Sequence, residues 1–153
     1  MDEALHGIEA VFLDLDGTIY LGSELIDGAL EFLSRCDNQG VKRFFLSNNS
    51  SRSVGQYVEK LQGLGIPATT DDVLLSTHDL ISWLSANRIT KTWLVGTEGM
   101  RQMLEGVGVD TTSAEPEYVV LGYDTEISYE KIATASIHLH KGVPMVASHP
   151  DMV

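Results

Sequence analysis

Two aspartates stand two positions apart at the end of a short apolar run. Val11-Phe12-Leu13 is typical of a buried strand, and Asp14-Leu15-Asp16-Gly17 follows it directly. Gly17 permits a sharp turn, so both carboxylates can reach one site beyond the carboxyl end of the strand, where open parallel sheets bind ligands. A carboxylate there can attack phosphorus to give an aspartyl-phosphate, and two carboxylates suit Mg²⁺, which prefers oxygen ligands. The alternative is a polar turn that only closes the strand, because Asp and Gly favour turns.

A second polar cluster follows the next apolar run. Val41 to Leu46 indicates a strand, and Ser47, Asn48 and Asn49 come immediately after it. A hydroxyl and amides at a strand end can hold phosphate oxygens without adding a competing acid or base. The alternative is a helix N-cap, a position that Ser and Asn also favour.

The elements that must position these side chains alternate between strands and helices. Apolar residues at helical spacing follow each of the two strands, and glycines stop both stripes, as expected at helix ends. The stripes are Ala29, Leu30, Phe32, Leu33 and Cys36 before Gly40, and Val54, Tyr57, Val58, Leu61 and Leu64 before Gly65. Short turns between strands and helices imply parallel strands with right-handed crossovers. The sequence therefore predicts an α/β fold.

A second strand–helix series fills the rest of the chain. We expect strands over 92–95, 118–121 and 144–147, and helices marked by Leu80, Met100 and Ile132 with their apolar neighbours. A boundary near Ser76 gives two parts, residues 1–75 and 76–153. The last expected strand has no helix after it to cover it, whereas a parallel strand needs cover on both faces. We therefore expect more chain to follow.

The order apolar strand, then Asp14-Leu15-Asp16-Gly17-Thr18, resembles the first motif of the haloacid-dehalogenase superfamily. This resemblance implies that Asp14 is the nucleophile and that Asp16 is the general acid and base. It also implies that Mg²⁺ binds Asp14 together with the backbone carbonyl of Asp16. Ser47, about thirty residues later, resembles the second motif, whose Ser or Thr binds phosphate, and Asn48 and Asn49 would add donors beside it.

Further segments narrow the resemblance to one subgroup of phosphatases. The chain is similar to the p-nitrophenyl, phosphoglycolate and pyridoxal phosphatases and to the nucleotidase of the NagD type. The matching stretches are 16–20, 25–29, 47–52, 95–99, 115–122, 128–131 and 147–151. The resemblance implies a Rossmann-like core whose first strands and helices occupy residues 1–75. It implies that residues 76–153 are the front part of an inserted α/β cap, through which a homodimer would form.

Two motifs of the family have no counterpart here. One carries a Lys in a Gly-Lys-Pro setting, and the other is an acidic stretch that completes the Mg²⁺ site. Lys141-Gly142-Val143-Pro144 is not taken as the Gly-Lys-Pro motif, because it joins a helix to a strand of the cap-like part. We expect both motifs beyond Val153, and hence little or no turnover by residues 1–153 alone. The alternatives are a non-catalytic α/β fragment that binds phosphate or a metal, and a receiver-like phospho-acceptor. A receiver would be a complete five-strand domain without a cap.

Substrate choice is predicted from the segment before the chain end. Ser148-His149-Pro150-Asp151 stands where the family often has Thr-Asn-Pro-Asp. His149 could donate to an anionic group or change protonation near neutral pH, and Asp151 lies beside it. The alternative is a solvent-exposed turn before Pro150. The substrate expected from the resemblance is a small phosphorylated metabolite, of which the sequence does not specify the ester.

The bulk properties exclude several other functions. The net charge is -12, and the ten Lys and Arg residues are scattered along the chain, so a nucleic-acid partner is not expected. No run of eighteen apolar residues is present, which predicts no transmembrane helix. The N-terminus lacks the order of a signal peptide, and the single cysteine, Cys36, fits a reducing compartment and an inert core position. These features predict a cytoplasmic protein.

Overall fold

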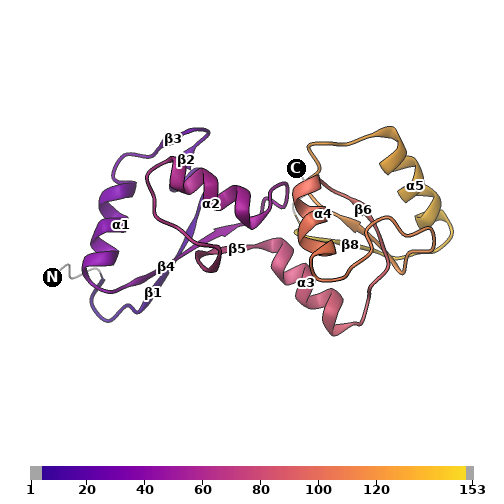
Figure 1. Ribbon diagram of the computed structural model, residues 1–153, viewed down its shortest axis with the longest axis horizontal. Helices are drawn as coiled ribbons and strands as arrows, with labels where there is room; N and C mark the ends of the chain where they lie inside the picture. The colour runs from indigo at the N-terminus through magenta and orange to yellow at the C-terminus, as the bar shows by residue number, and fades with distance from the viewer. Residues whose placement is uncertain (1–4, 151–153) are drawn as a thin grey trace. The chain divides into compact units, whose positions relative to one another are not determined.

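A computed structural model describes residues 5–150, and the chain divides into two compact units (Figure 1). The first unit comprises Met1–Ser47 and Val54–Leu74, and the second comprises Asn48–Ser53 and Leu75–Val153. The segment Asn48–Ser53 therefore belongs by its contacts to the second unit, although both of its neighbours along the chain belong to the first. Across residues 5–150, none of the helices has the length and apolar character needed to cross a membrane.

A three-stranded sheet in the order β1-β4-β5 forms the centre of the first unit. Its strands are β1 (Ala10–Asp14), β4 (Lys42–Ser47) and β5 (Val73–Leu75). The strands β1 and β4 are parallel, with Ala10 opposite Lys42 and Asp14 opposite Leu46. Both strands therefore end at the same edge of the sheet, which is where the sequence placed the two polar clusters.

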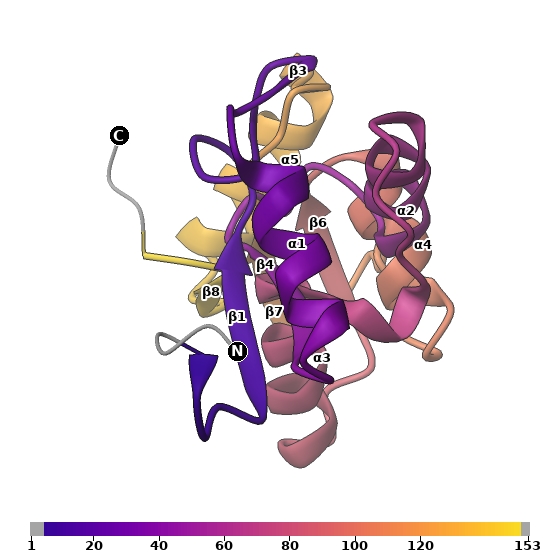
Figure 2. The ribbon, with the colours of Figure 1, turned by 90° about the vertical axis from the view of Figure 1, so that its left-hand side faces the viewer.

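Helices and one small hairpin complete the first unit. They are β2 (Tyr20–Leu21), β3 (Glu24–Leu25), α1 (Ala29–Asn38), α2 (Val54–Gly63) and the 3-10 helix η2 (Thr70–Asp72). Figure 2 shows α1 running along the sheet that contains β1 and β4. Cys36 of α1 is fully buried and packs in a cluster with Leu5 and Val41, so the apolar stripe predicted for this helix does face the core.

The second unit contains another parallel sheet, in the order β6-β7-β8. Its elements are α3 (Ser76–Ala86), β6 (Thr92–Val95), α4 (Glu98–Glu105), β7 (Tyr118–Leu121), α5 (Tyr129–His140) and β8 (Met145–Ala147). One apolar cluster joins α3 and α4 to the sheet, and it includes Leu84, Leu104 and Val120. A second cluster, of Val95, Val119 and Ala135, joins α5 to the sheet. The sheet is thus packed through both of its faces, as parallel sheets require.

Both tryptophans of the chain pack within this second unit. The Trp83 ring lies edge-on to Tyr118, with ring centroids 5.3 Å apart. Trp93 Nε1 donates to the backbone carbonyl of Lys131 at 3.1 Å and so ties β6 to α5. These contacts agree with the alternating strands and helices predicted from the sequence, and the predicted α/β fold is confirmed.

Candidate active site

Asp14 is the last residue of β1 and lies at the carboxyl edge of the first sheet. Its register partner on β4 is Leu46, and Ser47 is the next residue along that strand. Asp14 is exposed, whereas Ser47 keeps only 7% of its surface accessible. The two side chains that the sequence assigned to nucleophile and phosphate binding therefore end neighbouring parallel strands.

A tight turn after β1 carries Asp16. The carbonyl of Leu15 accepts three backbone amides, from Thr18 at 3.2 Å, Ile19 at 3.0 Å and Tyr20 at 3.3 Å. Gly17 closes the turn at a φ of 87°, a conformation in which a side chain would be strained. The Leu15 side chain is fully buried, and the aspartates on both sides of it are exposed. Burial of this leucine therefore fixes a turn that leaves both carboxylates at the surface of the same strand end.

Ser47 is held by a tyrosine of the following helix. Its hydroxyl lies 3.0 Å from the hydroxyl of Tyr57 on α2, and Tyr57 is almost completely buried. A buried hydroxyl pair of this kind fixes the side-chain rotamer of Ser47. The tyrosine was assigned from the sequence only to the apolar face of its helix.

Lys60 lies beside the candidate site, and the sequence analysis did not single it out. Its ammonium lies 3.9 Å from Asp16 Oδ1 and 3.5 Å from the centroid of the Tyr20 ring. The lysine side chain is only 19% exposed, which strengthens its attraction to the ring face. Lys60 stands three residues after Tyr57 on α2, so both lie on the same face of the helix. This helical spacing was the one sequence signal that could have placed Lys60 near the site.

The two asparagines after Ser47 lie in the segment Asn48–Ser53. Asn49 Oδ1 accepts the backbone amide of Ser51 at 3.0 Å and forms a turn. The backbone carbonyl of Asn48 accepts the hydroxyl of Ser76 at 3.1 Å. Asn48 and Asn49 thus lie in a turn that directly follows Ser47. In this turn the backbone carbonyl of Asn48 and the side-chain oxygen of Asn49 each accept a hydrogen bond.

The residues predicted for substrate choice are only partly described. His149 follows β8 in the second unit, and its Nδ1 lies 3.0 Å from the hydroxyl of Ser148. Asp151 lies outside residues 5–150, which the structure describes. A role for either residue in recognition stays a prediction.

The donor set fits Mg²⁺ in one binding mode. No group of three or more His, Cys, Asp or Glu side chains among the described residues could hold a metal ion. Mg²⁺ is, however, commonly bound through one or two carboxylates together with substrate phosphates and water. Asp14 and Asp16 supply two carboxylates and a backbone carbonyl at one strand end, which suits that mode and not an all-protein cage.

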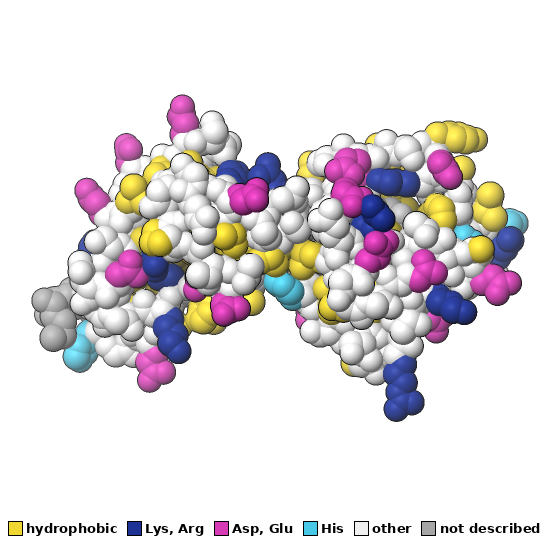
Figure 3. Space-filling model, viewed as in Figure 1, with side chains coloured by type: hydrophobic (Ala, Val, Ile, Leu, Met, Phe, Trp, Pro, Cys, Tyr) yellow, Lys and Arg dark blue, Asp and Glu magenta, His cyan; other side chains and the backbone are white. Residues whose placement is uncertain are grey.

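Charge and thiol chemistry elsewhere are consistent with a site centred on Asp14. On the face shown in Figure 3, basic side chains lie singly or in small groups with acidic side chains nearby. Cys36 is fully buried, and this burial raises the pKa of its thiol. A buried thiol with a raised pKa holds little thiolate, so Cys36 is poorly suited to act as a nucleophile.

The protein has an α/β fold, and its candidate site lies at the carboxyl edge of a parallel sheet. A family model described as haloacid dehalogenase-like hydrolase matches residues 11–110. The chain belongs to this family. The resemblance drawn from the motifs at Asp14 and Ser47 is thereby confirmed.

Individual relatives agree with this membership. The chain is 32% identical over 146 residues to an acid sugar phosphatase of Staphylococcus epidermidis, covering 94% of this chain and 56% of the relative. A crystal structure of 4-nitrophenylphosphatase from Thermotoga maritima matches with a TM-score of 0.88 and 35% identity, over 95% of this chain and 56% of that one. A glycerol phosphate phosphatase of Mycobacterium tuberculosis in complex with magnesium matches with a TM-score of 0.84 and 29% identity, over 94% and 45%.

The chain spans slightly more than half the length of the curated relatives that it matches. Within this span the solved structures align with both units, because the matches cover 94% to 95% of the chain. The likeness therefore extends from the strand that carries Asp14 into the second unit.

Proposed function

We propose that the complete protein hydrolyses small phosphate monoesters and that Asp14 is the nucleophile. The observation that carries this proposal is the register of β1 and β4, which sets Asp14 opposite Leu46 and one residue short of Ser47. Neighbouring strands lie about 4.8 Å apart, a separation that one tetrahedral phosphate can bridge. A phosphate held by the Ser47 hydroxyl would therefore lie within reach of the Asp14 carboxylate.

The two aspartates have different tasks in the proposed reaction. A carboxylate oxygen of Asp14 bonds to phosphorus as the ester P–O bond breaks, and protonated Asp16 gives its proton to the departing alcohol oxygen. Asp16 then takes a proton from water, and the hydroxide oxygen bonds to phosphorus. The bond between Asp14 and phosphorus breaks, which releases inorganic phosphate and restores the carboxylate of Asp14 and the proton of Asp16.

Other groups in the first unit support phosphate binding. The Ser47 hydroxyl, oriented by Tyr57, would contact a phosphate oxygen, and Asn48 and Asn49 would add donors. Lys60, 3.9 Å from Asp16, places a positive charge beside the site in a chain of net charge -12. That charge offsets part of the long-range repulsion that an acidic protein exerts on an anionic substrate.

Asp14 and the backbone carbonyl of Asp16 are the groups that would hold Mg²⁺. When bound, the ion neutralises charge on the phosphoryl group during transfer. The names of the relatives refer to sugar phosphate, 4-nitrophenyl phosphate and glycerol phosphate, so a small metabolite with one phosphate ester is the proposed substrate. A homodimer through the second unit is a further expectation of the resemblance.

The nucleophile is tested by Asp14→Asn in the complete protein. An amide of nearly the same shape cannot form the acyl-phosphate, so turnover of p-nitrophenyl phosphate should fall by at least about 10³-fold while circular dichroism is unchanged. Asp37→Asn is the matched control, because Asp37 is an exposed residue of α1 that pairs with Arg43 and is not assigned to the site. Turnover by Asp14→Asn within tenfold of the wild type would refute the assignment.

The second candidate function is a non-catalytic module that binds phosphate or a metal. The observation that favours it is that the Ser47 hydroxyl and the carboxylates of Asp14 and Asp16 end neighbouring strands, an arrangement that can bind phosphate or Mg²⁺ without catalysing a reaction. Residues 1–153 assayed beside the complete protein distinguish the two. Turnover confined to the complete protein supports the phosphatase, and phosphate or Mg²⁺ binding without turnover by either supports the module.

A further inference from the structure

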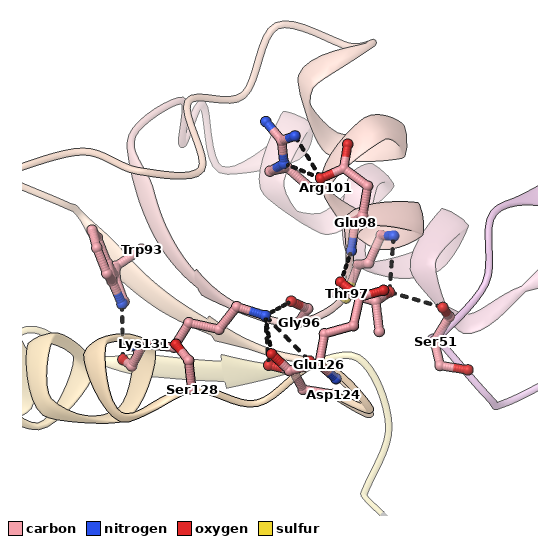
Figure 4. Close-up of polar contacts among 11 residues, drawn as sticks. Ser51, Trp93, Gly96, Thr97, Glu98, Arg101, Asp124, Glu126, Ser128 and Lys131 are labelled. Carbon is pink, nitrogen blue, oxygen red and sulfur yellow. Dashed lines mark hydrogen bonds and ion pairs between the residues drawn. The ribbon is translucent and has the colours of Figure 1, made fainter.

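The segment Asn48–Ser53 is fastened to the second unit at several points. The carbonyl of Asn48 accepts the Ser76 hydroxyl at the start of α3. The carbonyl of Ser51 accepts the Thr97 hydroxyl at 2.8 Å, as Figure 4 shows. Thr97 is also the N-cap of α4, where its hydroxyl accepts the amide of Met100. The segment that continues from Ser47 is therefore tied to the first turns of two helices.

Ser50 lies at the centre of this attachment and has no exposed surface. Its hydroxyl oxygen accepts the backbone amide of Tyr123 at 2.8 Å and the hydroxyl of Ser148 at 2.9 Å. Tyr123 stands two residues after β7, and Ser148 is the first residue after β8. One buried hydroxyl therefore joins the segment to two loops at the carboxyl ends of the second sheet.

The hydrogen-bond network extends from Ser148 to His149. A serine hydroxyl has one proton, and Ser148 gives it to Ser50. The Ser148 hydroxyl also lies 3.0 Å from His149 Nδ1, and the tautomer of the imidazole decides which of these two atoms donates. Ser50 is thus connected to His149 through the hydroxyl of Ser148.

We propose that Ser50 is a positioning residue for the phosphate-binding segment Ser47–Asn49. This inference rests on the proposed function, because it assigns Ser47, Asn48 and Asn49 to phosphate. Ser50 is only three residues beyond Ser47, and three residues span at most about 11 Å, so fixing Ser50 restricts the path of the backbone between them. Catalytic groups must be held to within about 0.5 Å, and a shift of about 1 Å can cost up to about 10²-fold in rate.

The test is Ser50→Ala in the complete protein, with p-nitrophenyl phosphate as substrate and inorganic phosphate as competitive inhibitor. The alanine removes the acceptor for Tyr123 and Ser148 but adds no atom to a fully buried position. We expect the inhibition constant of phosphate and the KM to rise at least tenfold. Amide hydrogen exchange of the segment Asn48–Ser53 should become faster, while exchange of the β1 and β4 amides stays unchanged.

Ser113→Ala is the matched control. Ser113 is another buried serine of the second unit, and its hydroxyl accepts the amide of Glu115. This hydrogen bond lies outside the segment Asn48–Ser53, so its loss should leave both constants within twofold of the wild type while lowering the melting temperature. Ser148→Ala removes one of the two contacts to Ser50 and should raise the phosphate constant by a smaller factor, about threefold. This variant carries the test if Ser50→Ala does not fold.

The outcomes separate the inference from the function on which it rests. Phosphate inhibition within twofold of the wild type in Ser50→Ala, or in Ser148→Ala where Ser50→Ala does not fold, would overturn the positioning role and leave the phosphatase intact. A wild-type protein that neither hydrolyses the ester nor binds phosphate would overturn both. A raised phosphate constant with faster exchange in the segment, absent from Ser113→Ala, is the result that we expect.

Discussion

Replacing Gly122 by alanine should destabilise the second unit, because the added methyl group would collide with Met100. A Cβ at Gly122 would lie 2.3 Å from Sδ and 3.2 Å from Cε of Met100, and 3.1 Å from the Ser50 hydroxyl. Carbon–sulfur contacts need well over 3 Å, so the Met100 thioether must move by about 1 Å or more. Met100 is fully buried in a cluster with Leu104 and Val120, which leaves it little room to move.

The expected magnitude follows from this overpacking. Inserting one methyl group into a well-packed core costs about 1–3 kcal/mol of stability. Because methionine is flexible and can yield in part, we expect Gly122→Ala to cost about 2 kcal/mol, in the middle of that range. The φ of Gly122 does not lie in the left-handed region, so backbone strain adds nothing to this cost. For a protein of this size or larger, about 2 kcal/mol lowers the melting temperature by roughly 4–8 °C.

Urea denaturation of the complete protein, followed by tryptophan fluorescence, measures this loss. Gly63→Ala is the matched control, because a Cβ at Gly63 on α2 would meet nothing within 4 Å and its φ is ordinary. That variant should be unchanged or more stable by up to about 1 kcal/mol. Combining Gly122→Ala with Met100→Ala should give a favourable coupling energy above about 1 kcal/mol, since the new methyl group then occupies the vacated space. Equal stability of the two glycine variants, or strict additivity in the cycle, would refute the steric argument.

Three further predictions concern the site and its surroundings. Asp16→Ala should impair hydrolysis of an alkyl phosphate at least about tenfold more than that of p-nitrophenyl phosphate, because a good leaving group needs less proton donation; equal losses would contradict the acid role. Chelation of Mg²⁺ should abolish turnover and Ca²⁺ should restore it poorly, owing to its larger and looser coordination, whereas full activity after exhaustive chelation would exclude the metal requirement. Lys131→Met should lower the free energy of unfolding by about 2–3 kcal/mol, less than the roughly 3–5 kcal/mol of a fully buried pair. The reason is that the Asp124 side chain, only 2% exposed, loses its partner ammonium 3.0 Å away, while the Lys131 side chain is 26% exposed. A denaturation curve that matches the wild type would contradict this prediction.

The elements that carry the site could be predicted because their signals are local. An apolar run before Asp14, a second run before Ser47 and a helical stripe ending at Cys36 each depend on residues close in sequence, and β1, β4 and α1 lie where those signals indicated. The hairpin of β2 and β3 was not predicted, since strands of two residues are too short to show an alternating pattern.

The partners of the site residues could not be predicted in the same way. Contacts such as Ser50 with Ser148, 98 positions apart, leave no periodic trace in a single sequence. The same holds for Tyr57 beside Ser47 and for Lys60 beside Asp16, where helical spacing gives the face but not what lies opposite it. The assignment of residues 1–75 to a core and 76–153 to a cap stays a prediction, and the structure adds that Asn48–Ser53 contacts the second unit.

The placement of the two tryptophans makes the second unit spectroscopically distinct. Trp83 packs on Tyr118 and Trp93 donates to the Lys131 carbonyl, so both indoles report on the same sheet and its helices. Within this chain the first unit contributes only tyrosine emission, from buried Tyr20 and Tyr57. Excitation at the red edge of the absorption band, applied to residues 1–153, would therefore follow the unfolding of the second unit alone. Comparison with the helical circular dichroism of the whole chain would show whether the two units melt together or one after the other.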